Sequence, residues 1–327
     1  MADASPPGFD WSQLVEHWVT EHEGWLGLAD ALIRRMTLAG SDAPELDAVH
    51  KGLRRLSKRA QGGGGQYGRW LLRHFGVPPD ATRRLQWFAQ YHSRFADMPT
   101  SVRRDQLLLW DRPPTSESNA IAWVHVGLAS IHHRRLERDD ADERLRAAQR
   151  TAPSGPVLAR LETLLLTARL AADDDAYDNA GACLDQAEAL LDDEDPEHAP
   201  VRARLHGQRA FILTRTRTDA ARFADARALF DTLPADSGVP FVDYRRTAGL
   251  AYTTWRLGHT EEAAALARRA CEHAGDGGYV RFRVMSLNML ARIVGGDEAR
   301  TLRARAARLA DAIEDAHLGE IARIDDR

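Results

Sequence analysis

The chain has few cysteines, no long apolar run and almost none of the alternating polar and apolar residues that mark β-strands. Cys183 and Cys271 are its only cysteines, which excludes a disulfide framework and a zinc site built from cysteines. No apolar run approaches the roughly 18 residues that a membrane-spanning helix requires. The start of the chain lacks a basic segment followed by an apolar one, so we expect no secretory signal and a cytoplasmic location.

What the chain does contain is helical periodicity. Its 327 residues are 44% hydrophobic and 28% charged, the composition of an ordinary globular protein. Apolar residues recur at helical spacing, and turns rich in glycine or proline interrupt them mostly every 12 to 20 residues. The sequence therefore predicts an all-α fold preceded by a disordered tail at residues 1–9.

Charge is segregated along the chain, although the formal net charge is only −4. Residues 50–84 carry nine basic residues and one acid, Asp80, for a net charge of +8. Residues 171–198 carry eleven acidic residues and no lysine or arginine, for a net charge of −11. Such blocks create local fields that the total conceals, although a solvated helix face or loop explains each of them as well.

From about residue 119 onward, small and apolar residues recur in a fixed pattern. Five units share it, and their first alanines lie 39, 46, 37 and 36 residues apart. A further helix with a small residue near its middle precedes each unit. The units are Ala141, Leu145 and Ala148; Ala180, Leu184 and Ala187; Ala226, Phe230 and Leu233; Ala263, Ala267 and Ala270; and Ala299, Arg303 and Ala306.

The fourth unit contains Leu257-Gly258 at a turn, followed five residues after the glycine by Ala263. Because it contains this motif, the segment 119–327 resembles the tetratricopeptide-repeat family. The resemblance implies a right-handed α-solenoid of helix pairs whose curved groove binds a protein or peptide and performs no chemistry of its own. An irregular, alanine-rich helical bundle is the alternative.

Repeat geometry also predicts which residues would bind. We expect the first helix of each pair to line the concave face, and residues 301–324 to form one capping helix with a polar outer side. The groove residues expected to contact a partner are Arg209, Arg215, Arg245, Tyr252 and Trp255.

The preceding part of the chain shows no repeat. Residues 10–112 are expected to form a helical domain with a basic, tryptophan-rich surface, and the proline-rich segment 113–118 to connect it to the repeats. Six of the eight tryptophans lie in this domain. The expected helices span residues 11–22, 25–38, 43–60, 66–75, 80–95 and 101–110.

The helix expected at 43–60 has two distinct faces. Asp42 should cap it, with Pro44 in the first turn. Apolar residues three and four apart form one stripe and basic residues form another. The basic stripe is a candidate surface for nucleic acid, for an acidic protein or for the chain's own acidic block at 171–198, and a solvated basic face is the alternative. Its residues, with two from the next helix, are Lys51, Arg54, Arg55, Lys58, Arg69 and Arg73.

A glycine loop at 62–65 runs into the helix expected at 66–75. Free backbone N–H groups at such a helix start, with Arg69 and Arg73 one turn apart beyond it, can hold a phosphate. A helix precedes the loop instead of a strand, so the spacing of its glycines does not indicate a dinucleotide-binding fold. A flexible turn between two helices is the alternative.

We find no catalytic triad, no metal-ligand spacing and no cofactor motif, so we expect no catalytic residue, metal or cofactor. The sequence favours a non-enzymatic adaptor or regulator that binds a protein or peptide in the groove. The alternative is a nucleic-acid-binding regulator with the repeats as its sensor, because some bacterial regulators join a small helical DNA-binding domain to tetratricopeptide repeats.

Overall fold

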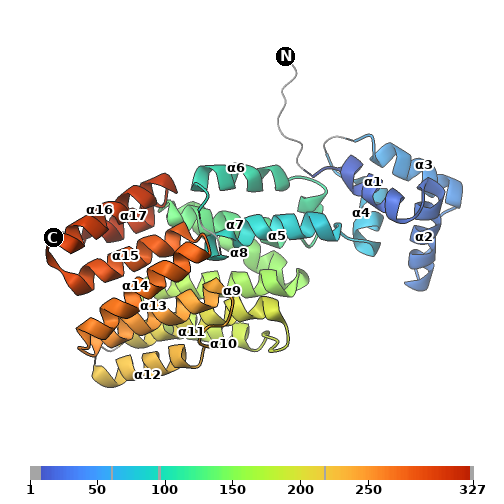
Figure 1. Cartoon of the computed structure of the whole chain (residues 1–327). Helices are drawn as coiled ribbons and strands as arrows, with labels where there is room; N and C mark the ends of the chain where they lie inside the picture. Colours follow the sequence, from blue (N-terminus) through green and yellow to red (C-terminus); the bar gives the residue numbers. More distant parts are fainter. Residues whose placement is uncertain (1–8, 60–61, 95–96, 217–218, 325–327) are drawn as a thin grey trace, which may run out of the picture.

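The computed structural model describes residues 9–59, 62–94, 97–216 and 219–324. These ranges contain helices and no strand, so the expected all-α fold is confirmed (Figure 1). None of their helices combines the length and the apolar character that crossing a membrane would take. The helices are α1 (Trp11–Glu21), α2 (Trp25–Leu38), α3 (Leu46–Leu56), α4 (Gly65–His74), α5 (Pro79–Arg94), α6 (Thr100–Trp110), α7 (Ile121–Arg134), α8 (Arg138–Thr151), α9 (Val157–Asp173), α10 (Tyr177–Glu188), α11 (Ala199–Thr216), α12 (Ala220–Asp231), α13 (Pro240–Arg256), α14 (Thr260–Asp276), α15 (Val280–Val294), α16 (Gly296–Ala312) and α17 (Ala316–Ile324).

Helices α1 to α4 form a lobe at one end of the molecule, with its own buried core (Figure 1). The bounds of the expected helices hold within one residue in this part of the chain, except for α3, which runs only from Leu46 to Leu56. Its N-cap is Glu45, which makes no side-chain cap, so the cap expected from Asp42 is wrong. The reason is Pro44, which disfavours helical backbone in the residue before it.

The six tryptophans of this part differ in exposure: two are core residues, three are partly buried and one is exposed. Trp11 is fully buried and Trp110 is nearly so, whereas Trp87 is exposed. Glycines of the loop and of α4 make room for the Trp11 ring: a Cβ at Gly64 would lie 2.4 Å from it and a Cβ at Gly68 2.7 Å.

Helices α5 and α6 do not share the core of α1–α4. Their buried residues pack on α7 together with residues of α8 and α9. The guanidinium of Arg103 on α6 reinforces this contact, because it donates to the carbonyls of Phe88 (2.9 Å) and Gly127 (3.0 Å). The break between the two cores therefore falls near residues 75–78, ahead of the connector expected at 113–118. Phe9, assigned to the disordered tail, stacks on Trp110 at 5.6 Å, and residues 1–8 lie outside the described ranges.

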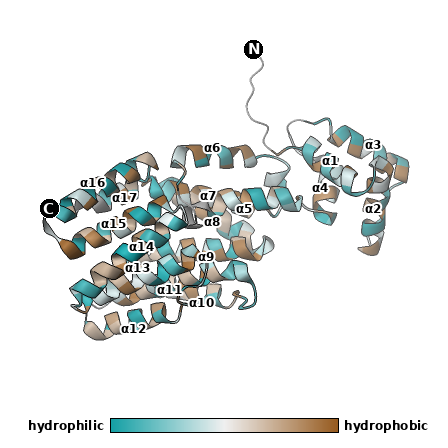
Figure 2. Cartoon of the chain, in the orientation of Figure 1, coloured by the Kyte–Doolittle hydropathy of each residue, from teal (hydrophilic) through white to brown (hydrophobic). Residues whose placement is uncertain are grey.

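From α7 onward, consecutive helices pack as pairs: α7 with α8, α9 with α10, α11 with α12, α13 with α14 and α15 with α16. The first helix of each pair also contacts the first helix of the next. Except for Arg303, the recurring residues of the five sequence units are all buried, and all but Leu233, which follows α12, lie on the second helices. At some positions even alanine is too large: a Cβ at Gly249 would lie 2.3 Å from the Phe230 ring. Figure 2 shows hydrophobic and hydrophilic residues alternating along these helices.

The single capping helix expected at 301–324 is wrong, because the chain breaks into α16 and α17. Glu314 at the break has a left-handed backbone, with φ at 54°. The carboxylate of Asp315 then accepts the amide of Leu318 at 3.1 Å and so starts α17. This last helix packs on α7 as well as on α15 and α16, so the C-terminal end of the array meets its beginning (Figure 1).

Candidate binding groove

A groove of about 520 Å³ opens among the first helices of the later pairs. Its walls come mainly from α11, α13 and α15, with Arg169 of α9 at one side and Leu318 of α17 at another. Most of the wall is apolar, as is usual for ligand sites of this size. Of the residues expected to contact a partner, Arg215 and Tyr252 line this groove.

Arginines and aromatic rings gather at one end of the groove, in what we call the arginine mouth. It consists of Arg215, Tyr252, Trp255, Arg256, Arg292 and Arg303. The guanidinium of Arg256 lies 5.9 Å from the centre of the Tyr252 ring and 6.0 Å from that of Trp255, and it donates to the Tyr252 hydroxyl at 3.2 Å. Arg215 lies 5.1 Å from the Phe211 ring. No acidic side chain within the described ranges lines the groove or the mouth.

The other two expected groove arginines lie elsewhere. Arg209 donates to Asp185 at 2.7 Å and to Glu188 at 2.8 and 3.0 Å, so it ties α11 to α10 and does not line the groove. Arg245 lies deep inside, 5.9 Å from the rings of both Phe241 and Phe282. Burial lowers the pKa of Arg245 to about 10. It lies directly behind the groove wall, because a Cβ at Gly207 would be 3.5 Å from its guanidinium.

Arg245 belongs to a set of regularly spaced arginines that the sequence analysis missed; Arg134 and Arg204 of this set are buried. Each of α7, α9, α11, α13 and α15 supplies one. The buried carboxylates Glu162 and Asp315 form ion pairs with the arginines of α11 and α15. Glu162 pairs with the α11 arginine at 2.5 Å. The sequence signal was present, because these arginines recur on the apolar first helices at intervals of 35, 35, 41 and 36 residues. They are Arg134, Arg169, Arg204, Arg245 and Arg281.

The groove wall also holds an amide whose hydrogen bonds are unfilled. Asn288 on α15 is only 5% exposed, yet neither its side-chain oxygen nor its nitrogen has a hydrogen-bond partner among the described residues. Buried polar groups are nearly always paired, so an amide left open on a groove wall indicates a position where a ligand can donate and accept hydrogen bonds.

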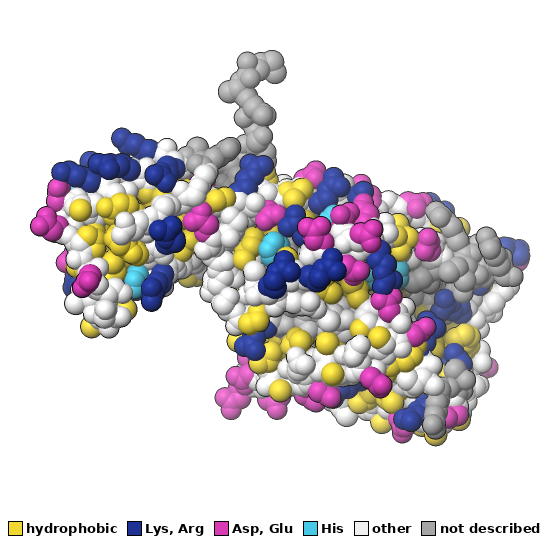
Figure 3. Space-filling model, turned by 180° about the vertical axis from the view of Figure 1, so that it is seen from behind, with side chains coloured by type: hydrophobic (Ala, Val, Ile, Leu, Met, Phe, Trp, Pro, Cys, Tyr) yellow, Lys and Arg dark blue, Asp and Glu magenta, His cyan; other side chains and the backbone are white. Residues whose placement is uncertain are grey.

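The basic stripe lies on the outer surface of the α1–α4 lobe, far from the groove (Figure 3). All six of its expected binding residues are exposed. Lys51 pairs with Asp47 at 2.6 Å and Arg54 lies 5.4 Å from the Trp25 ring. Arg55, Lys58, Arg69 and Arg73 have no ion-pair partner in the described part of the chain. The structure thus exposes basic residues of α3, of the turn after it and of α4.

Two other expectations for this lobe are changed. The amide of Gly64, at the start of α4, donates to both carboxylate oxygens of Glu117, at 3.2 and 3.3 Å, so an internal carboxylate takes the place expected for a phosphate. The acidic block at 171–198 does not pair with the basic stripe within the described ranges. Its ion pairs are made with arginines of the repeats: Arg138, Arg169, Arg202 and Arg209.

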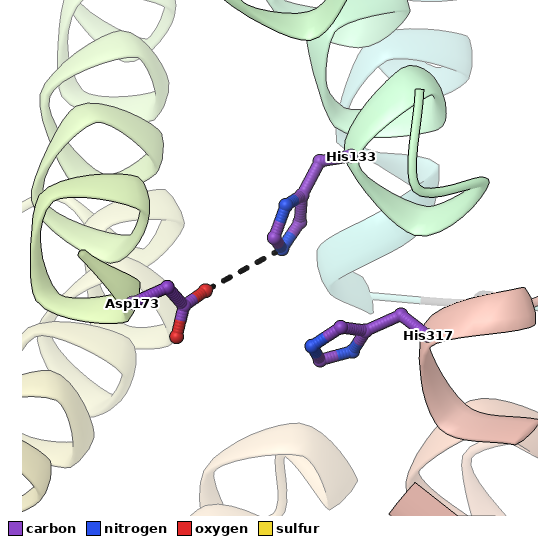
Figure 4. A group of neighbouring side chains, drawn as sticks. All are labelled: His133, Asp173 and His317. Carbon is purple, nitrogen blue, oxygen red and sulfur yellow. Dashed lines mark ion pairs between the residues drawn. The ribbon is translucent and has the colours of Figure 1, made fainter. Parts of the chain in front are cut away.

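Two histidines and a carboxylate also meet beside the groove (Figure 4). His133 lies in the last turn of α7, Asp173 is the last residue of α9, and His317 lies in the first turn of α17. Burial lowers the pKa of both histidines, that of His133 to about 3, and the neighbouring arginines lower them further. Both rings are therefore neutral at neutral pH. The sequence could not show this cluster, because its members are 40 and 144 residues apart.

The groove, the arginine mouth and the basic stripe are the candidate binding surfaces of this structure. Neither the models of known protein families nor the curated proteins match this sequence.

Proposed function

We propose that this chain is a non-enzymatic binding protein of the cytoplasm whose groove takes an acidic peptide or an acidic segment of a protein. One observation carries the proposal: arginines and aromatic rings line the groove and its mouth, and the described residues of this lining include no aspartate or glutamate. A ligand with carboxylates would gain charge-assisted hydrogen bonds there, which are stronger than neutral ones. The apolar wall would bury its hydrophobic side chains.

The proposed architecture is a right-handed, tetratricopeptide-like solenoid. Three observations support it: consecutive helices pack in pairs, first helices contact first helices, and alanines mark the close approaches between helices. In such an array the first helices share the inner surface, which is where the groove lies. The open amide of Asn288 supports binding of a peptide, because a peptide backbone offers both a donor and an acceptor.

The test uses fluorescein-labelled peptides of equal length and equal apolar content that are acidic, neutral or basic. We expect the full chain to bind the acidic set most tightly. Reversing charge in the mouth with Arg215→Glu and Arg256→Glu should weaken that binding by at least about tenfold, as expected for charge-assisted contacts in a partly desolvated site.

Arg209→Glu is the matched control, because this arginine lies on the same helix as Arg215 but outside the groove lining. It should leave peptide affinity unchanged. Equal binding of the acidic and basic sets, or equal losses in the control and the mouth variants, would contradict the proposal.

A second candidate function rests on the basic stripe of α3 and α4, where Arg55, Lys58, Arg69 and Arg73 are exposed and have no ion-pair partner among the described residues. We propose nucleic-acid binding there as the alternative. A phosphate-driven complex weakens steeply with salt, with a slope of about −0.9 per phosphate contact on duplex DNA. Exchanging Arg55, Lys58, Arg69 and Arg73 for glutamine should flatten that slope, whereas a salt-independent response of the unaltered chain would remove the alternative.

A further inference from the structure

Beside the groove, three potential metal ligands converge from three helices. The nitrogen and oxygen atoms that His133, Asp173 and His317 offer all lie within 4.8 Å of one another. The Nε2 atom of His133 is 3.7 Å from Asp173 Oδ2, and the two imidazole rings are 5.2 Å apart. In Figure 4 both rings point toward the space beside the carboxylate.

The hydrogen bonds of the cluster are incomplete as well. His317 Nδ1 is buried and has no hydrogen-bond partner among the described residues. The distance of 3.7 Å between His133 and Asp173 is too long for a hydrogen bond. Unpaired polar atoms of this kind call for an explanation such as a missing ion.

We propose that His133, Asp173 and His317 bind a divalent transition-metal ion of the zinc class. Two imidazoles and one carboxylate form a donor set that suits Zn²⁺ and its first-row neighbours and does not suit Ca²⁺ or Mg²⁺. Three protein ligands leave a fourth tetrahedral position open for water or for a group of another ligand. The site needs only small adjustments, because ligand atoms around Zn²⁺ lie about 3.4 Å apart and side-chain rotation covers the difference.

The surroundings are arranged to hold the carboxylate in place. Arg169 donates to both oxygens of Asp173, at 2.9 and 3.0 Å, and each oxygen keeps a second lone pair for a metal. The arginine charges oppose a cation, but Asp173 and Asp315 offset two of the three that lie nearby on Arg134, Arg169 and Arg281. The remaining positive charge should make zinc binding weaker than in closed structural zinc sites.

A second cluster of potential metal ligands differs from this one because its ring nitrogen already has a partner. His132, Glu137 and Asp140 also lie within 4.8 Å of one another. There, however, His132 Nδ1 already contacts Glu137 at 2.6 Å, and Arg135 holds the same carboxylate at 2.7 Å. The ring nitrogen is thus satisfied without an ion.

A bound metal would connect α17 to α7 and α9, across the contact where the array closes. It would also lie next to the groove, since Arg169 and Leu318, the neighbours of two ligands, line that wall. The metal site does not depend on the proposed peptide ligand and can be tested without it.

The test titrates the full chain, purified through a chelator, with ZnCl₂ at pH 7 by calorimetry, and then with Co²⁺ by visible absorption. We expect one Zn²⁺ per chain, a rise in melting temperature with zinc, and the intense absorption of tetrahedral Co²⁺. His317→Ala and His133→Gln should each reduce zinc affinity by at least about 100-fold, since losing a direct ligand exceeds the loss from a supporting residue.

His132→Ala is the control and should keep both the stoichiometry and the affinity. Asp173→Asn, which preserves shape, separates a lost ligand from a lost fold, and circular dichroism of each variant checks the helices. No saturable binding to the unaltered chain, or binding that survives both His133 and His317 variants, would overturn the proposal.

Discussion

Replacing Asp315 with alanine should loosen the C-terminal helix from the rest of the molecule. The carboxylate of Asp315 is fully buried, lies 2.7 Å from Arg281 Nε and 3.9 Å from Arg134 Nε, and accepts the amide that starts α17. Alanine would therefore remove the carboxylate shared by the buried Arg134 and the partly buried Arg281. It would also remove a helix cap.

Removing one partner of a buried ion pair costs about 3–5 kcal/mol, and losing the cap adds about 1 kcal/mol where the two effects are independent. Because one carboxylate provides both interactions, we expect the free energy of unfolding to fall by about 3–5 kcal/mol in total. For a chain of 327 residues, this corresponds to a fall in melting temperature of roughly 4–7 °C. That loss is a large fraction of the stability of a typical protein.

The assay is urea unfolding of the unaltered chain, Asp315→Ala and the control Asp311→Ala, followed by circular dichroism. Asp311 lies on the exposed side of α16, so its replacement should change the free energy of unfolding by less than about 0.5 kcal/mol. If Asp315→Ala stays within about 1 kcal/mol of the unaltered chain, the buried charge is not what holds α17, and the reasoning fails.

Three further predictions follow from the same structure. The nearby arginines lower the pKa of Asp315 to about 2. Its contribution of about 2.5 kcal/mol to the free energy of unfolding should therefore be complete above the unfolded pKa of about 4 and should disappear as pH falls toward 2. Acid titration of the unaltered chain and of Asp315→Asn would show this difference. Gly68→Ala should destabilise the α1–α4 lobe by about 1–3 kcal/mol despite alanine's better helix propensity, because its Cβ would meet the Trp11 ring, whereas Gly181→Ala, with open space, should stabilise by about 0.5–1 kcal/mol; thermal melts that rank them otherwise would refute the packing argument. Glu117→Gln should cost about 1 kcal/mol by weakening the anion at the start of α4, and hydrogen exchange at Gly64 should accelerate; unchanged exchange would show that the contact does not form in solution.

The sequence predicted those parts of the fold that depend on local spacing. Alanines at corresponding positions of the units, such as Ala180 and Ala187, indicated the buried side of the second helices, because close helix approach tolerates only small residues. The break at Glu314 was missed, since a left-handed backbone at a non-glycine residue leaves no pattern in the sequence.

The candidate site was predictable only in part. Arg215, Tyr252 and Trp255 line the groove or its mouth because they face inward from first helices, as repeat geometry implies. Arg209 has the same helix and charge but meets Asp185 and Glu188, a pairing that only the neighbouring helix decides. The histidine and carboxylate cluster depends on where α17 docks, which no local pattern encodes.

The contact between α17 and the start of the array alters how this chain can come apart. In an open row of helix pairs, each pair depends on its neighbours alone, so an end can fray while the middle survives. Here α17 packs on α7, so the first and last helices of the array protect each other. The amide of Ser101 on α6 adds to this contact, because it donates to the carboxylate of Glu314 at 2.9 Å across 213 residues. Closing so long a loop costs little more than closing one of half the length, about 0.6 kcal/mol. The array of described helices therefore has no free end. Cleavage of the chain near residue 312 should expose apolar surface at both ends of the array at once, so the array should unfold cooperatively instead of fraying gradually.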